Sequence, residues 1–167
     1  MTNYEDTYRQ FTWDIPEFFN FGFDIIDRWG NESDKLALVS VDDSGRMEQR
    51  HTFSQLAHLS NQMANILTKY GIIKGDRVLI MLPNVPEWYT AVLGAIKLGA
   101  VFIPTPTLSS PRDIEYRIKQ SEAMAVITND EFADRFKGVK EHCPSLKTLF
   151  ITSGNKGEWI SLETPAF

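Results

Sequence analysis

The sequence has one cysteine, three histidines and no long apolar run. Cys143 has no second cysteine with which to form a disulfide, and a structural zinc site takes four ligands that these few residues supply poorly. No apolar stretch approaches the ~20 residues that a membrane-spanning helix needs. Lysine and arginine (17) are outnumbered by aspartate and glutamate (22), giving a net charge of −5. A basic surface is therefore lacking, which argues against nucleic acid or anionic lipid as the main partner.

From the residues at the amino terminus we do not expect a secretory signal. The first residues include Glu5, Asp6 and Asp14, and they contain neither a basic region nor an apolar stretch that would follow it. With a single cysteine in the chain, we expect a cytoplasmic location. The 167 residues, 43% of them hydrophobic and 23% charged, are enough for one globular domain with its own core.

Two common phosphate-binding motifs are missing, since no G-x-G-x-x-G or G-x-x-x-x-G-K-[ST] occurs after a predicted strand. Residues 152–157 imitate such a loop with two glycines and Lys156, but residues 158–162 are too short and irregular to supply the helix that should follow. We interpret this segment as a polar turn after an outer strand. The histidines lack a partner at a catalytic spacing, and Cys143 at a helix carboxyl end is not expected to form a thiolate.

Residues 1–34 form an aromatic segment distinct from the rest. We predict a short helix in it that Asn20 caps and Gly30 ends. Its aromatic side chains are too many for one face of a solvated helix. Two interpretations stay open: they close over this domain's own core, or some of them face protein that is not in this chain.

Residues 35–167 alternate short apolar runs with helical patterns. A hairpin is predicted from residues 36–41, a turn at 42–45 and a return strand at 47–51. Four buried strands are predicted at residues 77–82, 100–103, 124–128 and 148–152. Helices are predicted to begin at Thr52 (with Gln55, a capping box), Asn84, Ser110 (a second capping box) and Asp130. The first, second and fourth are predicted to end near Gly71, Gly99 and Cys143. Within the second of these helices, Gly94 indicates close packing.

This alternation predicts an α/β fold: a largely parallel sheet with helices on both faces and a β-hairpin near the amino terminus. We divide the chain into an aromatic helical segment, residues 1–34, that docks on an α/β subdomain, residues 35–167.

Several short segments, in order and with ordinary gaps, resemble the adenylate-forming enzymes and most closely the acyl-CoA synthetases. They are Thr52-Phe53-Ser54-Gln55-Leu56, Gly71-Ile72-Ile73-Lys74-Gly75-Asp76-Arg77-Val78, Leu82-Pro83-Asn84-Val85-Pro86-Glu87-Trp88 and residues 94–104. The opening Phe19-Asn20-Phe21-Gly22-Phe23-Asp24 with Trp29 and the closing Cys143-Pro144-Ser145-Leu146 are similar to the medium-chain branch. The resemblance thus covers nearly the whole chain.

The resemblance implies a fragment of an AMP-forming ligase that joins a carboxylic (fatty) acid to coenzyme A through an acyl-adenylate. It also implies part of a large amino-terminal domain whose ATP-binding core and carboxy-terminal domain are absent here. ATP, Mg²⁺ and coenzyme A are therefore expected for the full-length enzyme, with none bound to this chain. We expect no catalytic residue and no metal ligand in the chain, which alone should be inactive. Its partner is the remainder of the synthetase, and the sequence leaves homo-oligomerisation open.

One loop carries the only site residues that we predict. In the family, the loop after the Phe-x-Pro strand borders the coenzyme A channel, which implies weak candidates in Thr107, Ser109 and Ser110. Leu108 stands where the medium-chain branch often has a polar residue, so no polar contact is expected there. The structural alternative for Ser110 is helix capping. Two other functions are kept as alternatives: a stand-alone nucleotide or acyl binding module, and an interaction protein that pairs through its aromatic face.

Overall fold

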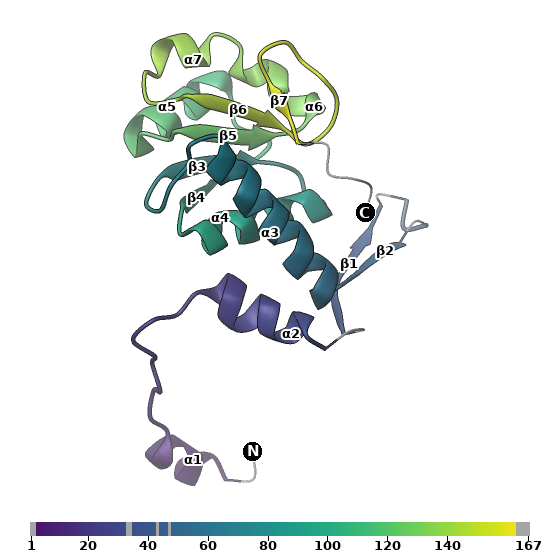
Figure 1. The fold of residues 1–167 in the computed structure, drawn as a ribbon, viewed down its shortest axis with the longest axis vertical. Coiled ribbons are helices and arrows are strands. Elements are labelled where there is room, and N and C mark those ends of the chain that lie inside the picture. Colours follow the sequence, from purple (N-terminus) through teal and green to yellow (C-terminus); the bar gives the residue numbers. More distant parts are fainter. Residues whose placement is uncertain (1–2, 33–34, 43, 47, 163–167) are drawn as a thin grey trace.

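The computed structural model describes residues 3–32, 35–42, 44–46 and 48–162. A five-stranded sheet in the order β4-β3-β5-β6-β7 lies at its centre, and every neighbouring pair of strands is parallel (Figure 1). The strands are β3 (Arg77–Met81), β4 (Val101–Pro104), β5 (Ala125–Thr128), β6 (Thr148–Ile151) and β7 (Ile160–Ser161). The predicted α/β fold with a largely parallel sheet is confirmed.

Helices cover both faces of this sheet. One face carries α3 (Phe53–Lys69) and α4 (Pro86–Leu98); the other carries α5 (Pro111–Ser121), α6 (Asp130–Ala133), the 3₁₀ turn η2 (Asp134–Phe136) and α7 (Val139–His142). Alternate residues of β3 divide between two hydrophobic clusters. Val78 and Ile80 pack with residues of α3 and α4, whereas Leu79 and Met81 pack with residues of α5 and the helices after it. Burial on both faces explains why the strand sequence does not alternate.

Two of the predicted helix starts are confirmed in atomic detail. Thr52 Oγ1 accepts the Gln55 backbone N–H at 3.2 Å, and Gln55 Oε1 accepts the Thr52 N–H at 2.8 Å. Ser110 and Asp113 form the same reciprocal pair at the start of α5. These caps satisfy backbone donors that would otherwise lack a partner.

The other two predicted caps were wrong. Asn84 was the predicted cap of α4, but Val85 precedes the helix and gives it no side-chain cap. The Asn84 Oδ1 atom instead accepts a hydrogen bond from the Tyr89 hydroxyl at 3.3 Å. Asn129, not Asp130, caps α6 and accepts the Phe132 N–H at 3.3 Å. The single helix predicted from there to Cys143 is instead broken into α6, η2 and α7, since Gly138 adopts a left-handed φ of 76°.

The strand predicted at residues 100–103 is also less buried than expected. In the described part of the chain β4 is an edge strand, with Val101 51% exposed. Pro104 suits this position because proline cannot donate to a further strand. Conversely, β6 is not an outer strand, since β7 pairs with it. β7 was not predicted because two residues carry no recognisable pattern.

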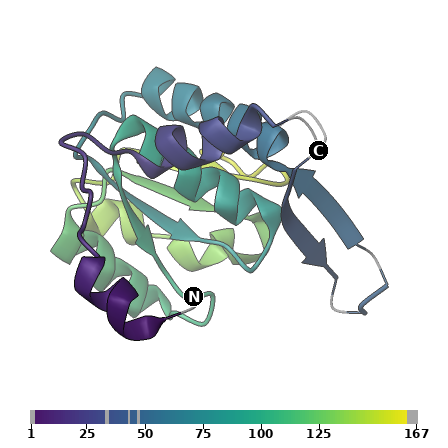
Figure 2. The same cartoon turned by 90° about the horizontal axis from the view of Figure 1, so that it is seen from below.

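The hairpin is confirmed: β1 (Leu36–Val41) and β2 (Glu48–Thr52) pair antiparallel and project from the body (Figure 2). In the predicted turn, the Gly45 N–H donates to the Asp42 carbonyl at 2.9 Å. Asp43 and Met47, which the prediction included, lie outside the described residues.

The amino-terminal segment packs on the body through one helix. It contains α1 (Tyr4–Gln10), the π-helix η1 (Gly22–Asp27) and α2 (Arg28–Gly30), and the last two form one continuous helix. Asn20 Oδ1 accepts the Gly22 N–H at 2.9 Å, as its predicted capping role requires. Ile26 is buried against α3 and α4. The π geometry and α1 were not predicted, and the division of the chain at residue 34 stays a prediction.

A buried cation holds this helix in place. The side chain of Lys97, on α4, is 1% exposed. Its ammonium lies 2.5 Å from Asp27 Oδ1 and donates to the Asn61 side chain at 2.7 Å and the Ala57 carbonyl at 3.1 Å. A Cβ at Gly22 would come within 2.4 Å of the Lys97 stem, so the helix can approach only with glycine there. Removing Asp27 would leave the buried Lys97 ammonium without its anionic partner, which is costly.

Candidate functional site

The carboxyl edge of the parallel sheet is where ligands bind in open α/β folds. β3 leads into α4 on one face, whereas its neighbours β4 and β5 lead into α5 and α6 on the other. The connections thus diverge at the end of β3. A groove of about 510 Å³ opens there between the hairpin and residues 83–87.

The charges around this groove do not suit a polyphosphate. Its charged lining residues are Asp42, Glu87 and Glu131, and no lysine or arginine contributes to it. Phosphate sites combine helix amino-terminal N–H groups with cations; the start of α4 lines this groove, but it is accompanied by three carboxylates and by no cation. The groove at the end of β3 therefore offers shape but not the electrostatics of an ATP site.

The predicted loop after β4 lies at the same carboxyl edge of the parallel sheet. Ser109 is 8% exposed, whereas Leu108 is 91% exposed. The Ser110 hydroxyl donates to Asp113 Oδ2 at 2.7 Å. This hydrogen bond and the backbone one from Ser110 lower the pKa of the Asp113 carboxyl. Ser110 therefore caps α5, which was the structural role considered for it. Its contact with a ligand stays a prediction.

Sequence reasoning missed the residue that holds this loop. Arg135, on η2, donates from Nη1 to the Thr107 carbonyl and, at 3.2 Å, to the Ser109 carbonyl. Its guanidinium carbon lies 5.0 Å from the centre of the Phe132 ring, in cation–π range. Arg135 thus forms hydrogen bonds with the backbone carbonyls of two of the three predicted site residues. Nothing in the sequence links Arg135 with a loop 26 to 28 residues earlier.

The loop at residues 152–157 is not a phosphate loop. Lys156 donates to the Asp130 carbonyl at 3.0 Å and lies 3.1 Å from Asp134 Oδ2 and 3.5 Å from Asp130 Oδ1. The hydrogen bond with Asp134 is the main cause of the raised pKa of Lys156. Its charge is already matched by two carboxylates, and β7 rather than a helix follows. The interpretation as a polar turn therefore holds, although the strand before it is not the outermost.

His142 is the last residue of α7 and Cys143 follows it. His142 Nδ1 lies 3.5 Å from Glu115 Oε2 at the surface. Cys143 is buried, and this burial raises the pKa of its thiol. Within the described ranges, no three His, Cys, Asp or Glu side chains gather as metal ligands would. None of the helices described there is both long and apolar enough to cross a membrane.

Curated relatives match almost the whole chain. It is 36% identical to the human protein "Acyl-coenzyme A synthetase ACSM3, mitochondrial" over 170 aligned positions, which cover 97% of this chain and 29% of that protein. It is also 36% identical to "Acyl-coenzyme A synthetase ACSM2, mitochondrial" of Rattus norvegicus, covering 90% of this chain and 27% of the relative. The chain thus spans less than a third of the length of these relatives. Both are mitochondrial proteins, so the expected cytoplasmic location is wrong.

Solved structures agree with the fold. An acyl-CoA synthetase of Brucella canis superposes with a TM-score of 0.80 at 24% identity, over 96% of this chain and 31% of that one. The anthranilate CoA ligase AuaEII, in complex with anthranoyl-AMP, gives a TM-score of 0.71 at 26% identity, over 83% of this chain and 26% of that one. The family model described as "AMP-binding enzyme" matches residues 27–162. The chain therefore belongs to the family of AMP-binding enzymes.

Proposed function

We propose that this chain is the amino-terminal portion of an AMP-forming acyl-CoA synthetase that acts on a carboxylic, fatty-type acid. In the first step, a carboxylate oxygen attacks the α-phosphorus of ATP, which forms the acyl-adenylate and releases pyrophosphate. In the second, the coenzyme A thiol attacks the acyl carbonyl, AMP leaves, and a thioester forms. The similarity to acyl-CoA synthetases over nearly the whole chain carries this proposal.

The positions of the resembling segments support a scaffold role. The segment that begins at Thr52 starts α3, and the segment at residues 71–78 turns into β3. Residues 82–88 lead into α4, and residues 94–104 continue through its end into β4. Each segment sets a turn or a helix start, and the one titratable side chain that they bring into the groove at the end of β3 is Glu87, in the first turn of α4. This portion thus shapes one side of the active site and leaves bond making to groups outside it.

The ATP phosphates find no free cation among the residues that line the groove at the end of β3. The groove at the end of β3 is lined by carboxylates without cations, and Lys156 is held by Asp130 and Asp134. No metal-ligand cluster occurs in the described residues. We therefore derive no step of the reaction through the metal or the triphosphate from this portion.

The loop after β4 is the part that we assign to coenzyme A. Thr107 and Ser109 would border the channel, with Ser110 fixing the start of α5 behind them. Arg135 acts as a positioning residue, because its guanidinium holds the carbonyls of Thr107 and Ser109. The loop would guide the thiol toward the acyl-adenylate without sharing in the first step.

The proposal is tested by the native gene and by activity. AMP release is measured with fatty acids of several lengths, ATP, Mg²⁺ and coenzyme A, for this chain and for the product of the native gene read beyond codon 167. We expect no turnover by this chain and turnover by the longer product. Turnover by this chain alone, or a stop codon directly after Phe167, would refute the proposal.

The loop assignment has its own test in the longer product. Arg135→Ala should raise the KM for coenzyme A by about tenfold, the equivalent of one charge-assisted hydrogen bond. Fatty-acid-dependent ATP–pyrophosphate exchange, which reports the first step alone, should be unchanged. Lys137→Ala, two residues away and exposed, is the matched control. Equal losses in both half-reactions would contradict a role specific to coenzyme A.

A further inference from the structure

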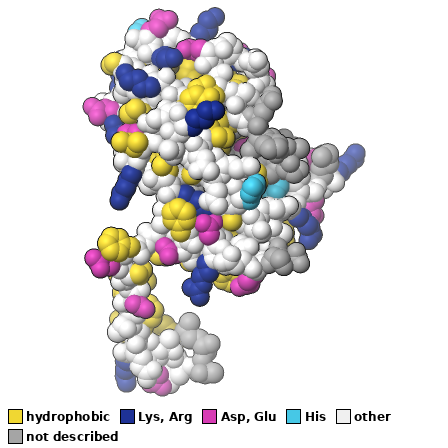
Figure 3. Space-filling model, in the orientation of Figure 1, with side chains coloured by type: hydrophobic (Ala, Val, Ile, Leu, Met, Phe, Trp, Pro, Cys, Tyr) yellow, Lys and Arg dark blue, Asp and Glu magenta, His cyan; other side chains and the backbone are white. Residues whose placement is uncertain are grey.

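The turn η2 lies between two loops that leave the carboxyl edge of the sheet. One is the loop after β4, and the other is the turn of residues 152–159 between β6 and β7. The second packs closely on the start of α6, since a Cβ at Gly154 would come within 3.2 Å of Asp130 Cγ. Acidic and basic side chains lie close together at the end of the molecule that β6, β7 and α7 occupy (Figures 1 and 3).

Each residue of η2 contacts a different part of the fold. Asp134 Oδ2 lies 3.1 Å from the Lys156 ammonium. Arg135 donates to two backbone carbonyls of the loop after β4. The Phe136 ring packs edge-to-face on Trp159, with the ring centres 5.6 Å apart. A 3₁₀ helix has three residues per turn, so the three side chains point in directions about 120° apart. One turn of backbone thus carries contacts with both loops.

The backbone of η2 does little to fix its own position. α6 has four residues and η2 has three, and helices this short are not stable by themselves. The chain is extended at Lys137 and then turns at Gly138, where φ is 76°. Phe136, which is 3% exposed, holds the inner side of η2 in the core. Side-chain contacts on the outer side therefore decide where the Arg135 guanidinium lies.

The charges of this segment make Lys156 important for Arg135. The α6–η2 segment carries three carboxylates, and Arg135 is its only cation. Hydrogen bonds between two ionised groups are the strongest, so these carboxylates compete with the loop carbonyls for the guanidinium. The Lys156 ammonium lies 3.1 Å from Asp134 Oδ2 and 3.5 Å from Asp130 Oδ1, and it thereby neutralises two of the competitors. The third, Glu131, lines the groove at the end of β3.

We propose that Lys156 is a positioning residue for the loop after β4. It pairs with Asp130 and Asp134, leaves Arg135 to the loop carbonyls, and so holds the loop in place for coenzyme A. The part of this inference that concerns coenzyme A rests on the proposed function. The coupling between Lys156 and the loop rests on the contacts of η2 alone.

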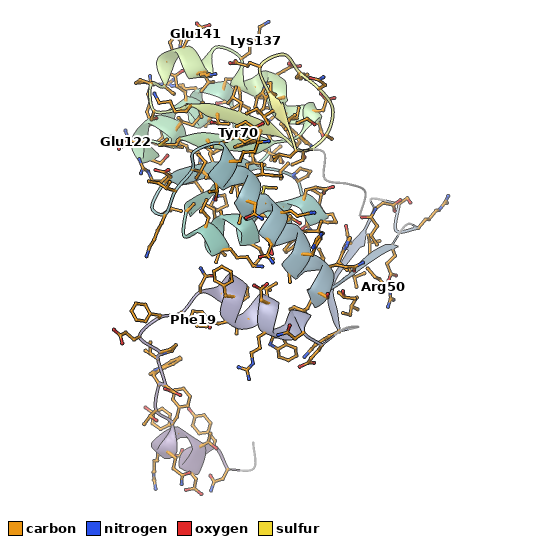
Figure 4. The ribbon with its side chains drawn as sticks, in the orientation of Figure 1. Phe19, Arg50, Tyr70, Glu122, Lys137 and Glu141 are labelled. Carbon is orange, nitrogen blue, oxygen red and sulfur yellow. The ribbon has the colours of Figure 1, made fainter. Side chains whose placement is uncertain are left out.

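Hydrogen exchange in the longer product, followed by mass spectrometry of a peptide that spans residues 105–110, tests the coupling. The Ser109 N–H donates to the Pro106 carbonyl at 3.0 Å, so its exchange reports how firmly the loop is held. Lys156→Met should speed this exchange by about threefold, as the loss of an exposed ion pair does. Arg135→Ala should speed it by about tenfold. Lys137 follows η2 directly and points away from the body (Figure 4), so Lys137→Met is the matched control and should change nothing.

The KM for coenzyme A tests what the coupling does for the reaction. Lys156→Met should raise this KM by about threefold, with kcat and fatty-acid-dependent ATP–pyrophosphate exchange unchanged. Lys156→Arg keeps the charge and should restore the KM. In the Arg135→Ala background, Lys156→Met should have no further effect, because the guanidinium that it positions is gone. A merely structural lysine would instead add its effect to that of Arg135→Ala.

The outcomes separate this inference from the proposed function. Loop exchange that Lys156→Met leaves unchanged, or KM effects that add in the double variant, would overturn the coupling. If Arg135→Ala raises the KM and Lys156→Met does not, the coupling is likewise overturned, while the assignment of the loop to coenzyme A stands. If both variants speed the exchange and neither changes the KM, the coupling is confirmed and the assignment to coenzyme A is refuted.

Discussion

The contact between α3 and α4 rests on one glycine, and replacing it gives a sharp prediction. Gly94 lies in the middle of α4, where a Cβ would come within 2.5 Å of Met63 Cγ and 2.6 Å of Met63 Cβ. Met63 is 4% exposed and belongs to the main core cluster. Its Cβ is fixed to the backbone of α3, so a side-chain rotation cannot relieve the clash. The two helices would have to move apart.

Two opposing effects set the size of the change. In an exposed helix, Gly→Ala stabilises by about 1 kcal/mol. At Gly94, overpacking of a well-filled core costs about 1–3 kcal/mol and disturbs the neighbouring contacts of α4. The difference between the two effects is a loss of up to about 2 kcal/mol in the free energy of unfolding for Gly94→Ala, which in a domain of this size lowers the Tm by up to a few degrees.

Urea denaturation followed by circular dichroism measures this change. Met63→Ala removes the Cγ contact but keeps the Cβ contact, so Gly94→Ala should cost less in that background, with a coupling of about 0.5 kcal/mol or more. Asn65→Ala, on the exposed side of α3, should stay within about 0.5 kcal/mol of the parent. Stabilisation by Gly94→Ala would refute the close approach of α3 and α4.

Two further predictions follow from buried or capped positions. Leu59 is 7% exposed on α3, so Leu59→Asp should cost more than about 4 kcal/mol, enough to unfold a marginal domain, and a thermal melt identical to that of the parent would contradict it. Asp113 has a lowered pKa, chiefly from the Ser110 hydroxyl. Its contribution to stability is therefore present above its unfolded-state pKa and is lost as the pH falls through the lower folded-state pKa. Ser110→Ala should destabilise the chain more at neutral pH than in strong acid, and urea melts giving an equal effect at both would refute the cap.

Local patterns predicted most helices and strands in the body of the domain, but not β7 or the breaks between α6, η2 and α7. The capping boxes at Thr52 and Ser110 were correct because both of their partners lie within one helical turn. The caps at Asn84 and Asp130 failed because competing partners decided them: a tyrosine hydroxyl in the first case and the neighbouring Asn129 in the second.

The candidate site was predicted only in part. The sequence pointed to Thr107, Ser109 and Ser110 through a family resemblance, and the capping of Ser110 could be read locally. The role of Arg135 could not be predicted, because it donates to two backbone carbonyls. Every residue has a backbone carbonyl, so the sequence does not indicate which ones accept a hydrogen bond. The neutralisation of Lys156 by Asp130 and Asp134 was hidden for a similar reason, since β6 brings these residues together across the fold.

The sequence by itself determined the alternation of strands and helices, the two reciprocal caps and the membership of an enzyme family, since these depend on side chains within a turn of each other or on an ordered set of short motifs. Only the tertiary structure decided the strand order, the exposure of β4, the anchoring of the amino-terminal helix on Lys97 and the exposure of the aromatic side chains before Asn20. These features depend on contacts between elements that are far apart in the sequence. Such contacts decide whether a charge or a strand edge is buried.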